Sequence, residues 1–236
     1  MLEDKVTLIT GASQGLGKAL ALAFAKEGAK VVVNARSEES IRPVAEEIEG
    51  TGAEVLAVAA DVSKSADVER MIDETVGRFG RIDVLVNNAG LLGPRVRIVE
   101  YPEDEWRRVI DANLTGTFLV SKAAIPHVPE GGSIINVVSG VSVEGRAEWG
   151  AYSVSKFGVE GLTQILAAEL EEHSVRVNAV DPGGMRTEMR AAAYPEEDPT
   201  TRITPEENTA VFLYLASDES KDVTGERFKA QEFRRK

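Results

Sequence analysis

Six short runs rich in apolar and β-branched residues recur along this chain, and segments with helical periodicity separate them. The runs occupy residues 5–10, 30–35, 54–61, 82–90, 132–139 and 175–184. They are too continuously apolar for strands with one face in solvent, and strands buried on both faces are typical of a parallel sheet covered by helices. The alternation therefore predicts an α/β, doubly wound fold, in which ligands bind beyond the carboxyl ends of the strands.

The alternation continues without an internal repeat, a low-complexity tract or a linker, so we predict a single domain over residues 1–236. Residues 188–204, which are rich in proline and acidic side chains, interrupt the pattern. A long segment of this kind inside a compact domain is often an active-site lid. We therefore predict that residues 188–204 form a mobile substrate lid over the cleft.

The composition excludes several classes of function. There are 27 Lys and Arg residues against 39 Asp and Glu, and the formal net charge of −12 argues against nucleic-acid or anionic-membrane partners. The absence of cysteine excludes disulfides, thiolate metal sites and cysteine nucleophiles. His127 and His173 have no partner at metal-ligand spacing, so we expect no metal site. With no apolar run of 18 residues and no leader-like N-terminus, the expected location is the cytoplasm.

Three glycines follow the first apolar run at the opening of a helical segment. Gly11, Gly15 and Gly17 allow a tight turn there, and a pyrophosphate can approach backbone N–H groups at the positive end of the helix. The spacing G-x-x-x-G-x-G differs from the G-x-G-x-x-G of many dehydrogenases. Its place between the first strand and the first helix nevertheless predicts a dinucleotide site.

The end of the second apolar run indicates which dinucleotide. An acidic residue at this point would bind the ribose 2′-hydroxyl of NAD, but the chain has Ala35 followed by Arg36. A guanidinium suits a 2′-phosphate, so we predict NADP(H). The alternative is that Arg36 is only a solvated loop residue and that both NADP(H) and NAD(H) bind. After the third run, Asp61 is a candidate acceptor for the adenine amino group and Val62 for packing on its ring. The alternative role of Asp61 is to cap the following helix.

Tyr152 and Lys156 stand four residues apart in a helical segment, so their side chains share one face of the helix. An ammonium near a phenol favours the phenolate, and it would lower the tyrosine pKa from its usual value of about 10. The pair could then exchange a proton with a substrate near neutral pH. The alternative is a packed ring beside a solvated amine.

Seven motifs occur in order along the chain, and together they cover nearly all of it. They are TGASQGLG 10–17, DV 61–62, NNAG 87–90, NLTGTF 113–118, IINVVS 134–139, YSVSK 152–156 and DPGGMRT 181–187. With these motifs the chain resembles the short-chain dehydrogenase/reductase family. The resemblance implies a Rossmann fold with a mostly parallel, seven-stranded sheet and helices on both faces. It also implies a catalytic group of Ser139, Tyr152 and Lys156, with Asn113 binding a water in the proton relay.

The resemblance extends the nucleotide site beyond the glycine turn. Its members would be Gly11, Ser13, Gln14, Gly15, Leu16, Gly17, Arg36, Asp61, Val62, Asn88, Ala89, Gly90, Tyr152, Lys156, Pro182, Gly183, Met185 and Thr187. Asn88, Ala89 and Gly90 would line the ribose, while the backbone of Met185 and the hydroxyl of Thr187 would meet the nicotinamide carboxamide. Lys156 would also hold the ribose hydroxyls.

The resemblance implies an NADP(H)-dependent oxidoreductase that interconverts a small-molecule carbonyl and alcohol, with Tyr152 as general acid and base. The chain is similar to 3-oxoacyl carrier-protein reductases and to a subgroup of uncharacterised bacterial oxidoreductases. Candidate substrate contacts flank the catalytic motifs: Val141, Val143, Trp149, Met189 and Tyr194. The alternative function is a catalytically silent nucleotide-binding regulatory or scaffold protein.

Two further expectations follow from the resemblance. A homodimer or homotetramer would pack the long helices expected around 104–124 and 153–172. The ending of the chain replaces a frequent aspartate-glycine-glycine sequence, although ERFKAQ, residues 226–231, still fits a seventh strand.

Overall fold

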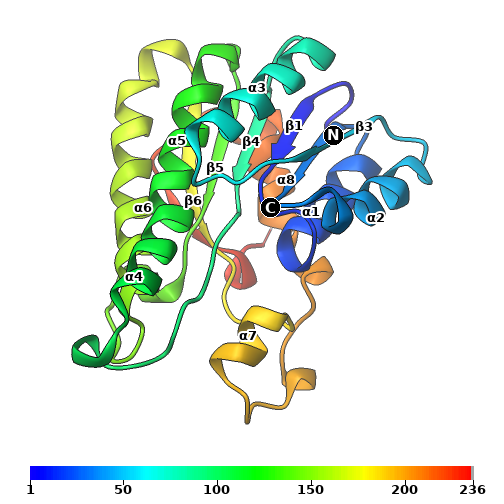
Figure 1. Ribbon diagram of the computed structural model, residues 1–236. Helices are drawn as coiled ribbons and strands as arrows, with labels where there is room; N and C mark the ends of the chain where they lie inside the picture. Colours follow the sequence, from blue (N-terminus) through cyan, green and yellow to red (C-terminus); the bar gives the residue numbers. More distant parts are fainter. Residues whose placement is uncertain (235–236) are drawn as a thin grey trace.

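The computed structural model describes residues 1–234 and consists of one seven-stranded sheet with helices on both faces (Figure 1). The strand order is β3-β2-β1-β4-β5-β6-β7, and every neighbouring pair is parallel. The strands are β1 Val6–Ile9, β2 Lys30–Ala35, β3 Val55–Ala59, β4 Val84–Asn87, β5 Ser133–Val137, β6 Arg176–Asp181 and β7 Arg227–Lys229. The predicted doubly wound fold is confirmed; residues 235–236 of the predicted domain lie outside the described residues.

Each of the six apolar runs contains one strand, and the expected seventh strand forms as β7. Most of the strands are shorter than the runs that predicted them. The run 82–90, for example, leaves the sheet after Asn87. The residues beyond it, Asn88 to Gly90, turn away from the ladder and line a cavity instead.

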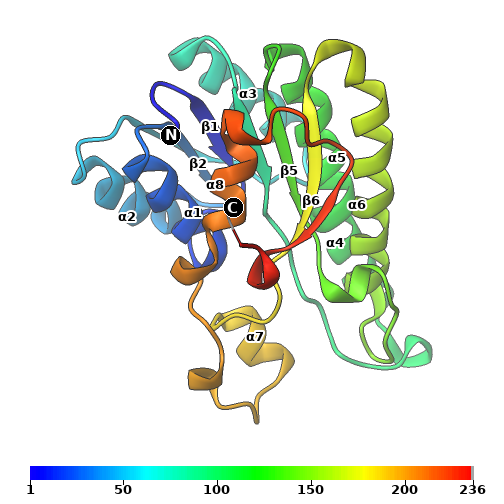
Figure 2. The ribbon, with the colours of Figure 1, turned by 180° about the vertical axis from the view of Figure 1, so that it is seen from behind.

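The helices divide between the two faces of the sheet. They are α1 Gly15–Lys26, α2 Glu38–Glu49, α3 Ser65–Phe79, α4 Glu103–Ile110, α5 Gly116–Ala124, α6 Gly150–Glu169, α7 Glu188–Ala193 and α8 Ala210–Ala216. Figures 1 and 2 show α1, α2 and α8 on one face and α3, α5 and α6 on the other, with α7 beyond the carboxyl ends of the strands. None of the helices in residues 1–234 is long and apolar enough to cross a membrane.

Alternation along the strands supplies both halves of the core, because successive side chains point to opposite faces of a sheet. Ile9 belongs to a buried cluster with Phe24 of α1 and Phe212 of α8. Its neighbour Leu8 belongs to a second cluster with Met71 of α3 and Val120 of α5. The sheet is therefore buried on both faces, which explains its near-continuous apolar sequence.

The long helices differ from the prediction. The segment 104–124 is interrupted by a π-helical turn over Asp111–Thr115, in which the Gly116 N–H donates to the Asp111 carbonyl. Such a turn inserts one extra residue into a helix and is common at functional sites. The second long helix, α6, begins at Gly150 and ends at Glu169, earlier than the expected 153–172.

Candidate active site

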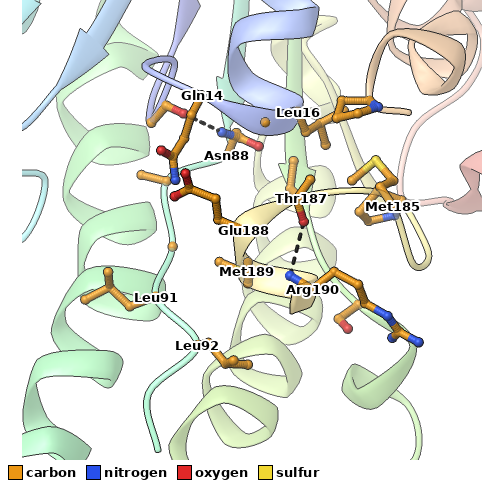
Figure 3. A pocket seen from close by; sticks show the side chains of 18 of the residues that line it. Gln14, Leu16, Asn88, Leu91, Leu92, Met185, Thr187, Glu188, Met189 and Arg190 are labelled. Atoms are coloured by element: carbon orange, nitrogen blue, oxygen red, sulfur yellow. Dashed lines mark hydrogen bonds between the residues drawn. The ribbon is translucent and has the colours of Figure 1, made fainter. Parts of the chain in front are cut away.

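A cavity of ≈ 970 Å³ opens at the carboxyl ends of the strands, where a doubly wound fold places its ligands. The segments that follow β1 to β6 all contribute to its lining. Figure 3 shows Leu91 and Leu92 on the segment after β4, and Thr187, Glu188 and Met189 around the start of α7. Elements far apart in the sequence therefore meet around one space.

Nearly all of the predicted nucleotide residues line this cavity. They are Gly11, Ser13, Gln14, Gly15, Leu16, Arg36, Asp61, Val62, Asn88, Ala89, Gly90, Tyr152, Lys156, Pro182, Gly183, Met185 and Thr187. Gly17 lies behind the lining, where a Cβ atom would fall 2.3 Å from the Gly11 carbonyl oxygen. Gly17 is therefore required for close packing of the turn, and the structure gives it no direct place on the cavity wall.

The glycine turn leaves the N-terminus of α1 open to the cavity. Gly11 and Gly15 adopt φ values of +65° and +55°, which favour glycine. The N-cap residue Gln14 makes no capping side-chain bond to a described residue, and the first turn carries no acidic side chain. Asn88 Nδ2 holds the turn from behind by donating to the carbonyls of Thr10 and Gly11, at 2.9 and 3.0 Å (Figure 3). The free N–H groups and the helix dipole suit an anion.

Arg36 and Asp61, which the sequence predicts to bind the adenosine end of a nucleotide, both line the cavity. Arg36 is exposed, and it contributes positive charge to the surroundings of Asp61. Burial acts to raise the pKa of Asp61, but hydrogen bonds from the Ser63 hydroxyl and amide, with Lys64 and Arg36 nearby, lower it below its ordinary value. Asp61 Oδ1 accepts both Ser63 bonds, at 2.7 and 3.0 Å. Helix α3 has Lys64 as its N-cap, so the alternative that Asp61 caps this helix is wrong.

Ser139, Tyr152 and Lys156 meet at the other end of the cavity. Ser139 is the N-cap of a short 3₁₀ turn after β5, and its hydroxyl interacts with the Tyr152 hydroxyl in a way that lowers the tyrosine pKa. Lys156 lies one turn further along α6, with its ammonium 6.0 Å from the centre of the Tyr152 ring. It is 4% exposed and donates a 2.6 Å hydrogen bond to the Val137 carbonyl.

The electrostatics of this group differ from the prediction. Burial raises the pKa of Tyr152, the interaction with Ser139 opposes that effect, and the negative charge of Asp181 adds to it. Burial also lowers the pKa of Lys156 to about 8, against an upward effect of Glu160. The expected lowering of the Tyr152 pKa by Lys156 is wrong for this conformation, because burial of the tyrosine outweighs other effects and the ammonium is directed at the Val137 carbonyl.

Asn113 lies outside the cavity lining and is fully buried in the π-helical turn. Its side-chain oxygen accepts from the Leu91 N–H at 2.7 Å, and its amide nitrogen donates to the Leu91 carbonyl at 2.9 Å and to Ser155 Oγ at 3.0 Å. The side chain therefore fixes the segment that follows β4. All of its described bonds are to the protein itself.

Of the candidate substrate contacts, Val141, Trp149 and Met189 line the cavity. Val143 and Tyr194 do not: Val143 is 58% exposed, and Tyr194 packs within the predicted lid. Leu91 and Leu92 line the cavity and were missed by the sequence reasoning, although their position directly after NNAG was a usable signal.

Arg95 is a second residue that the sequence did not indicate. Its guanidinium contacts two neighbouring aromatic rings, 4.6 Å from the centre of Trp149 and 5.1 Å from that of Tyr194. Its Nη1 donates to the Ala193 carbonyl at 2.7 Å. Trp149 in turn lies 5.6 Å from the Tyr152 ring. Arg95 therefore links the segment after β4, the start of α6 and the predicted lid by cation–π contacts.

The predicted lid is folded and held by ion pairs. Arg190 makes two 2.6 Å bonds to the Glu197 carboxylate and stacks at 3.7 Å on the Tyr194 ring. Hydrogen bonds from Arg190 and Arg202 hold the pKa of Glu197 at about 2. The segment thus has internal structure of its own while it lies at the mouth of the cavity.

The chain matches known proteins along its length. Residues 5–198 match the family model described as short chain dehydrogenase. The chain is 38% identical to the uncharacterized oxidoreductase YciK of Escherichia coli (strain K12), over 98% of this chain and 93% of that protein. It is 40% identical to the 3-oxoacyl-(acyl-carrier-protein) reductase FabG of Thermotoga maritima, over 95% of each. The structure of a short chain dehydrogenase from Shigella flexneri 2a, complexed with NADP, superimposes with a TM-score of 0.92 at 38% identity and 98% coverage of both chains.

Proposed function

The chain belongs to the short-chain dehydrogenase/reductase family, and we propose that it transfers hydride between NADP(H) and a small-molecule carbonyl or alcohol, with Tyr152 as general acid and base. The observation that carries this proposal is the meeting of Ser139, Tyr152 and Lys156 in a cavity whose other end is an open helix N-terminus. The three side chains supply proton transfer, and the helix N-terminus suits the pyrophosphate of a dinucleotide.

The residues present fit such a cofactor. The free N–H groups at the start of α1 would bind the pyrophosphate, and Arg36 would pair with the 2′-phosphate. Asp61 and Val62 line the region expected for the adenine, and Pro182, Gly183, Met185 and Thr187 that expected for the nicotinamide. When bound, NADP(H) supplies or accepts the hydride.

The proton chemistry belongs to the chain itself. In the reducing direction, the Ser139 hydroxyl donates a hydrogen bond to the substrate carbonyl oxygen and the Tyr152 hydroxyl gives that oxygen its proton. The raised pKa of Tyr152 keeps it protonated at neutral pH, as this role requires. Lys156 has a pKa of about 8, so near this pH it can supply a proton that reprotonates the tyrosine. The oxidising direction uses the same groups in reverse.

We propose that the π-helical turn that contains Asn113 binds the relay water through its backbone. Since the Asn113 side-chain amide is already paired with Leu91 and Ser155, a relay water would bind the backbone of the π-helical turn. The side chain would keep Leu91 in position at the cavity wall.

The substrate would enter beside an apolar wall of Leu91, Leu92, Val141, Trp149 and Met189. We propose that residues 188–204 form the lid over it. We also propose a homodimer or homotetramer, because Phe118 of α5 and Val154, Phe157 and Ile165 of α6 are apolar and between 43% and 55% exposed.

The proposal is tested by titrating NADPH and NADH against the nicotinamide fluorescence and then screening carbonyl substrates. The screen covers aldehydes, ketones, diketones, quinones and 3-oxoacyl thioesters, since the Thermotoga relative is named for the last class. We expect turnover with NADPH that falls by at least about 100-fold in Tyr152→Phe while NADPH binding is kept. Tyr214→Phe on α8, outside the cavity, is the matched control.

Two other results would reject the proposal at different levels. Tight NADPH binding with no turnover of any of these classes would favour a catalytically silent nucleotide-binding protein. Failure to bind either nucleotide would remove the assignment of the cavity as a dinucleotide site.

A further inference from the structure

Arg227, on the last strand, makes an ion-pair network directly behind the Ser139, Tyr152 and Lys156 group. Its Nε donates to Glu160 Oε1 at 2.9 Å, and its Nη2 donates to Asp181 Oδ2 at 3.0 Å and to the Ser139 carbonyl at 3.2 Å. The three side chains are between 10% and 22% exposed. Because solvent reaches these side chains only in part, it screens their charges less than it screens those of exposed ion pairs.

Both carboxylates also bind the segments that carry the proposed catalytic chemistry. Glu160 accepts a 2.7 Å bond from Ser142 Oγ, and Ser142 in turn bonds to both the carbonyl and the N–H of Ser139. Asp181 accepts a 2.9 Å bond from the Gly183 N–H, in the turn that leads to Met185 and Thr187. One arginine therefore ties together the Ser139 turn, helix α6 and the turn after β6.

The two carboxylates that Arg227 binds lie close to the two groups that exchange protons, Tyr152 and Lys156. Tyr152, Lys156 and Glu160 follow at intervals of four residues, so they occupy one face of α6. Asp181 approaches from the end of β6. From the other elements around α6, Arg108 of α4 lines the cavity but is paired with Glu105, and Arg146 lines it from an exposed loop.

We propose that Arg227 is a positioning residue, which fixes the Ser139 turn against α6 and balances the negative charge that Glu160 and Asp181 direct at Lys156 and Tyr152. It does not line the cavity, and it bonds to the backbone carbonyl of Ser139 and not to the hydroxyl proposed to react. The activity part of this inference rests on the proposed function, whereas the charge balance does not.

The sign of the charge effect follows from the groups already described. Glu160 raises the pKa of Lys156, and Asp181 raises that of Tyr152. Without Arg227, both carboxylates would act without compensation, so both pKa values would rise. Neutralising Glu160 would instead lower the pKa of Lys156. A role in stability alone predicts no such opposite shifts.

The decisive experiment follows the Lys156 side chain by NMR of isotope-labelled lysine in the nucleotide-free protein, with its signal assigned by loss in Lys156→Arg. We expect an apparent pKa near 8 in the native chain, higher by about one unit in Arg227→Met and lower by about one unit in Glu160→Gln. The double variant Arg227→Met/Glu160→Gln should return close to the native value. Arg227→Lys, which keeps the charge, should also stay close to it.

Lys229→Met is the matched control, because it removes an exposed positive charge from the same strand and Lys229 pairs with the exposed Glu232. We expect it to leave the Lys156 titration unchanged. In the assay, the alkaline limb of the kcat profile should move to higher pH in Arg227→Met, while KM for NADPH changes less than twofold. Arg227→Lys should restore the native profile.

An unchanged Lys156 pKa in folded Arg227→Met, or a shift in the same direction as in Glu160→Gln, would overturn the proposal. If Arg227→Met does not fold, Glu160→Gln decides: a Lys156 pKa that stays near 8 there is a negative result. Because the NMR titration needs neither nucleotide nor substrate, a protein that lacks turnover but shows the opposite shifts would refute the proposed function and leave the charge balance standing.

Discussion

The Lys156 ammonium donates a 2.6 Å hydrogen bond to the backbone carbonyl of Val137, at the end of β5. The carbonyl is neutral, and no carboxylate within residues 1–234 is bonded directly to the lysine, so burial governs the titration of the lysine. Burial lowers its pKa from the ordinary 10.5 to about 8.

This burial predicts a specific dependence of stability on pH. Below about pH 8, the lysine is protonated in both the folded and the unfolded chain, and the cost of the buried charge is fully present. Between about pH 8 and pH 10.5, the unfolded chain binds a proton that the folded chain has lost, so this group makes the free energy of unfolding rise with pH. The total rise is about 3 kcal/mol.

Urea unfolding across this pH window compares the native chain with Lys156→Met, which lacks the titrating group. From the low-pH end of the window to the high-pH end, the free energy of unfolding of the native chain should rise by about 3 kcal/mol relative to that of the variant. The exposed Lys221 provides the control as Lys221→Met. Parallel curves for the native chain and Lys156→Met would show that the lysine is not strongly desolvated.

Arg95 should hold the lid segment closed. In Arg95→Leu, the cation–π contacts with Trp149 and Tyr194 and the bond to the Ala193 carbonyl are all lost. Together these contacts are worth on the order of 1–2 kcal/mol, so we expect trypsin to cut after Arg190 or Arg202 about tenfold faster. Arg97→Leu, in the same loop and exposed, is the control. Equal rates of cutting in the two variants would argue against the clamp.

Gly17 should tolerate no side chain. In Gly17→Ala, the new Cβ would meet the Gly11 carbonyl at 2.3 Å and Asn88 Nδ2 at 2.6 Å, and both atoms hold the glycine turn. We expect a loss of about 1–3 kcal/mol in the free energy of unfolding and of at least about tenfold in NADPH affinity. Calorimetry and fluorescence titration measure the two effects.

Gly77→Ala is the matched control, because a Cβ at this exposed position in α3 would meet nothing within 4 Å. The same substitution should there stabilise the protein by up to about 1 kcal/mol and leave NADPH binding unchanged. If the two variants behaved alike, the packing of the glycine turn would not be the reason for Gly17.

Arg36 should decide the choice of nucleotide. Arg36→Ala removes the guanidinium that would pair with a 2′-phosphate, and NADPH affinity should fall by about 10- to 100-fold while NADH affinity changes little. Dissociation constants for both nucleotides at one salt concentration give the answer. The control is Arg42→Ala, which removes the same charge from an exposed arginine on α2 that pairs with Glu38. An equal loss for NADPH and NADH would mean that Arg36 acts on the nucleotide generally.

Much of the fold was predictable because its signals are local. The runs that form the central strands β1, β4, β5 and β6 are buried throughout, so their composition alone marks them as strands, and the glycine turn follows the first of them. Tyr152 and Lys156 share a face through helical spacing alone, and Ser139 joins them because the carboxyl ends of parallel strands lie at one edge of the sheet.

The remaining features depend on contacts between residues distant in the sequence. Arg227 bonds to the Ser139 carbonyl across 88 positions, and Arg95 bonds to the Ala193 carbonyl across 98. No local pattern marks the role of either arginine, because the residues that each one bonds to lie far away in the sequence. The NLTGTF motif marked Asn113, but not its partner Leu91, which lies 22 positions away and meets Asn113 at the π-helical turn.

The amino-acid sequence by itself thus determined the alternating architecture and the nucleotide turn, through periodicity and spacing, and the resemblance carried by its motifs identified the three residues proposed for catalysis. The tertiary structure alone decided how those residues titrate. A pKa depends on burial and on charges from every neighbouring element, and here burial raises that of Tyr152 and lowers that of Lys156 while Asp181 and Glu160 act from behind.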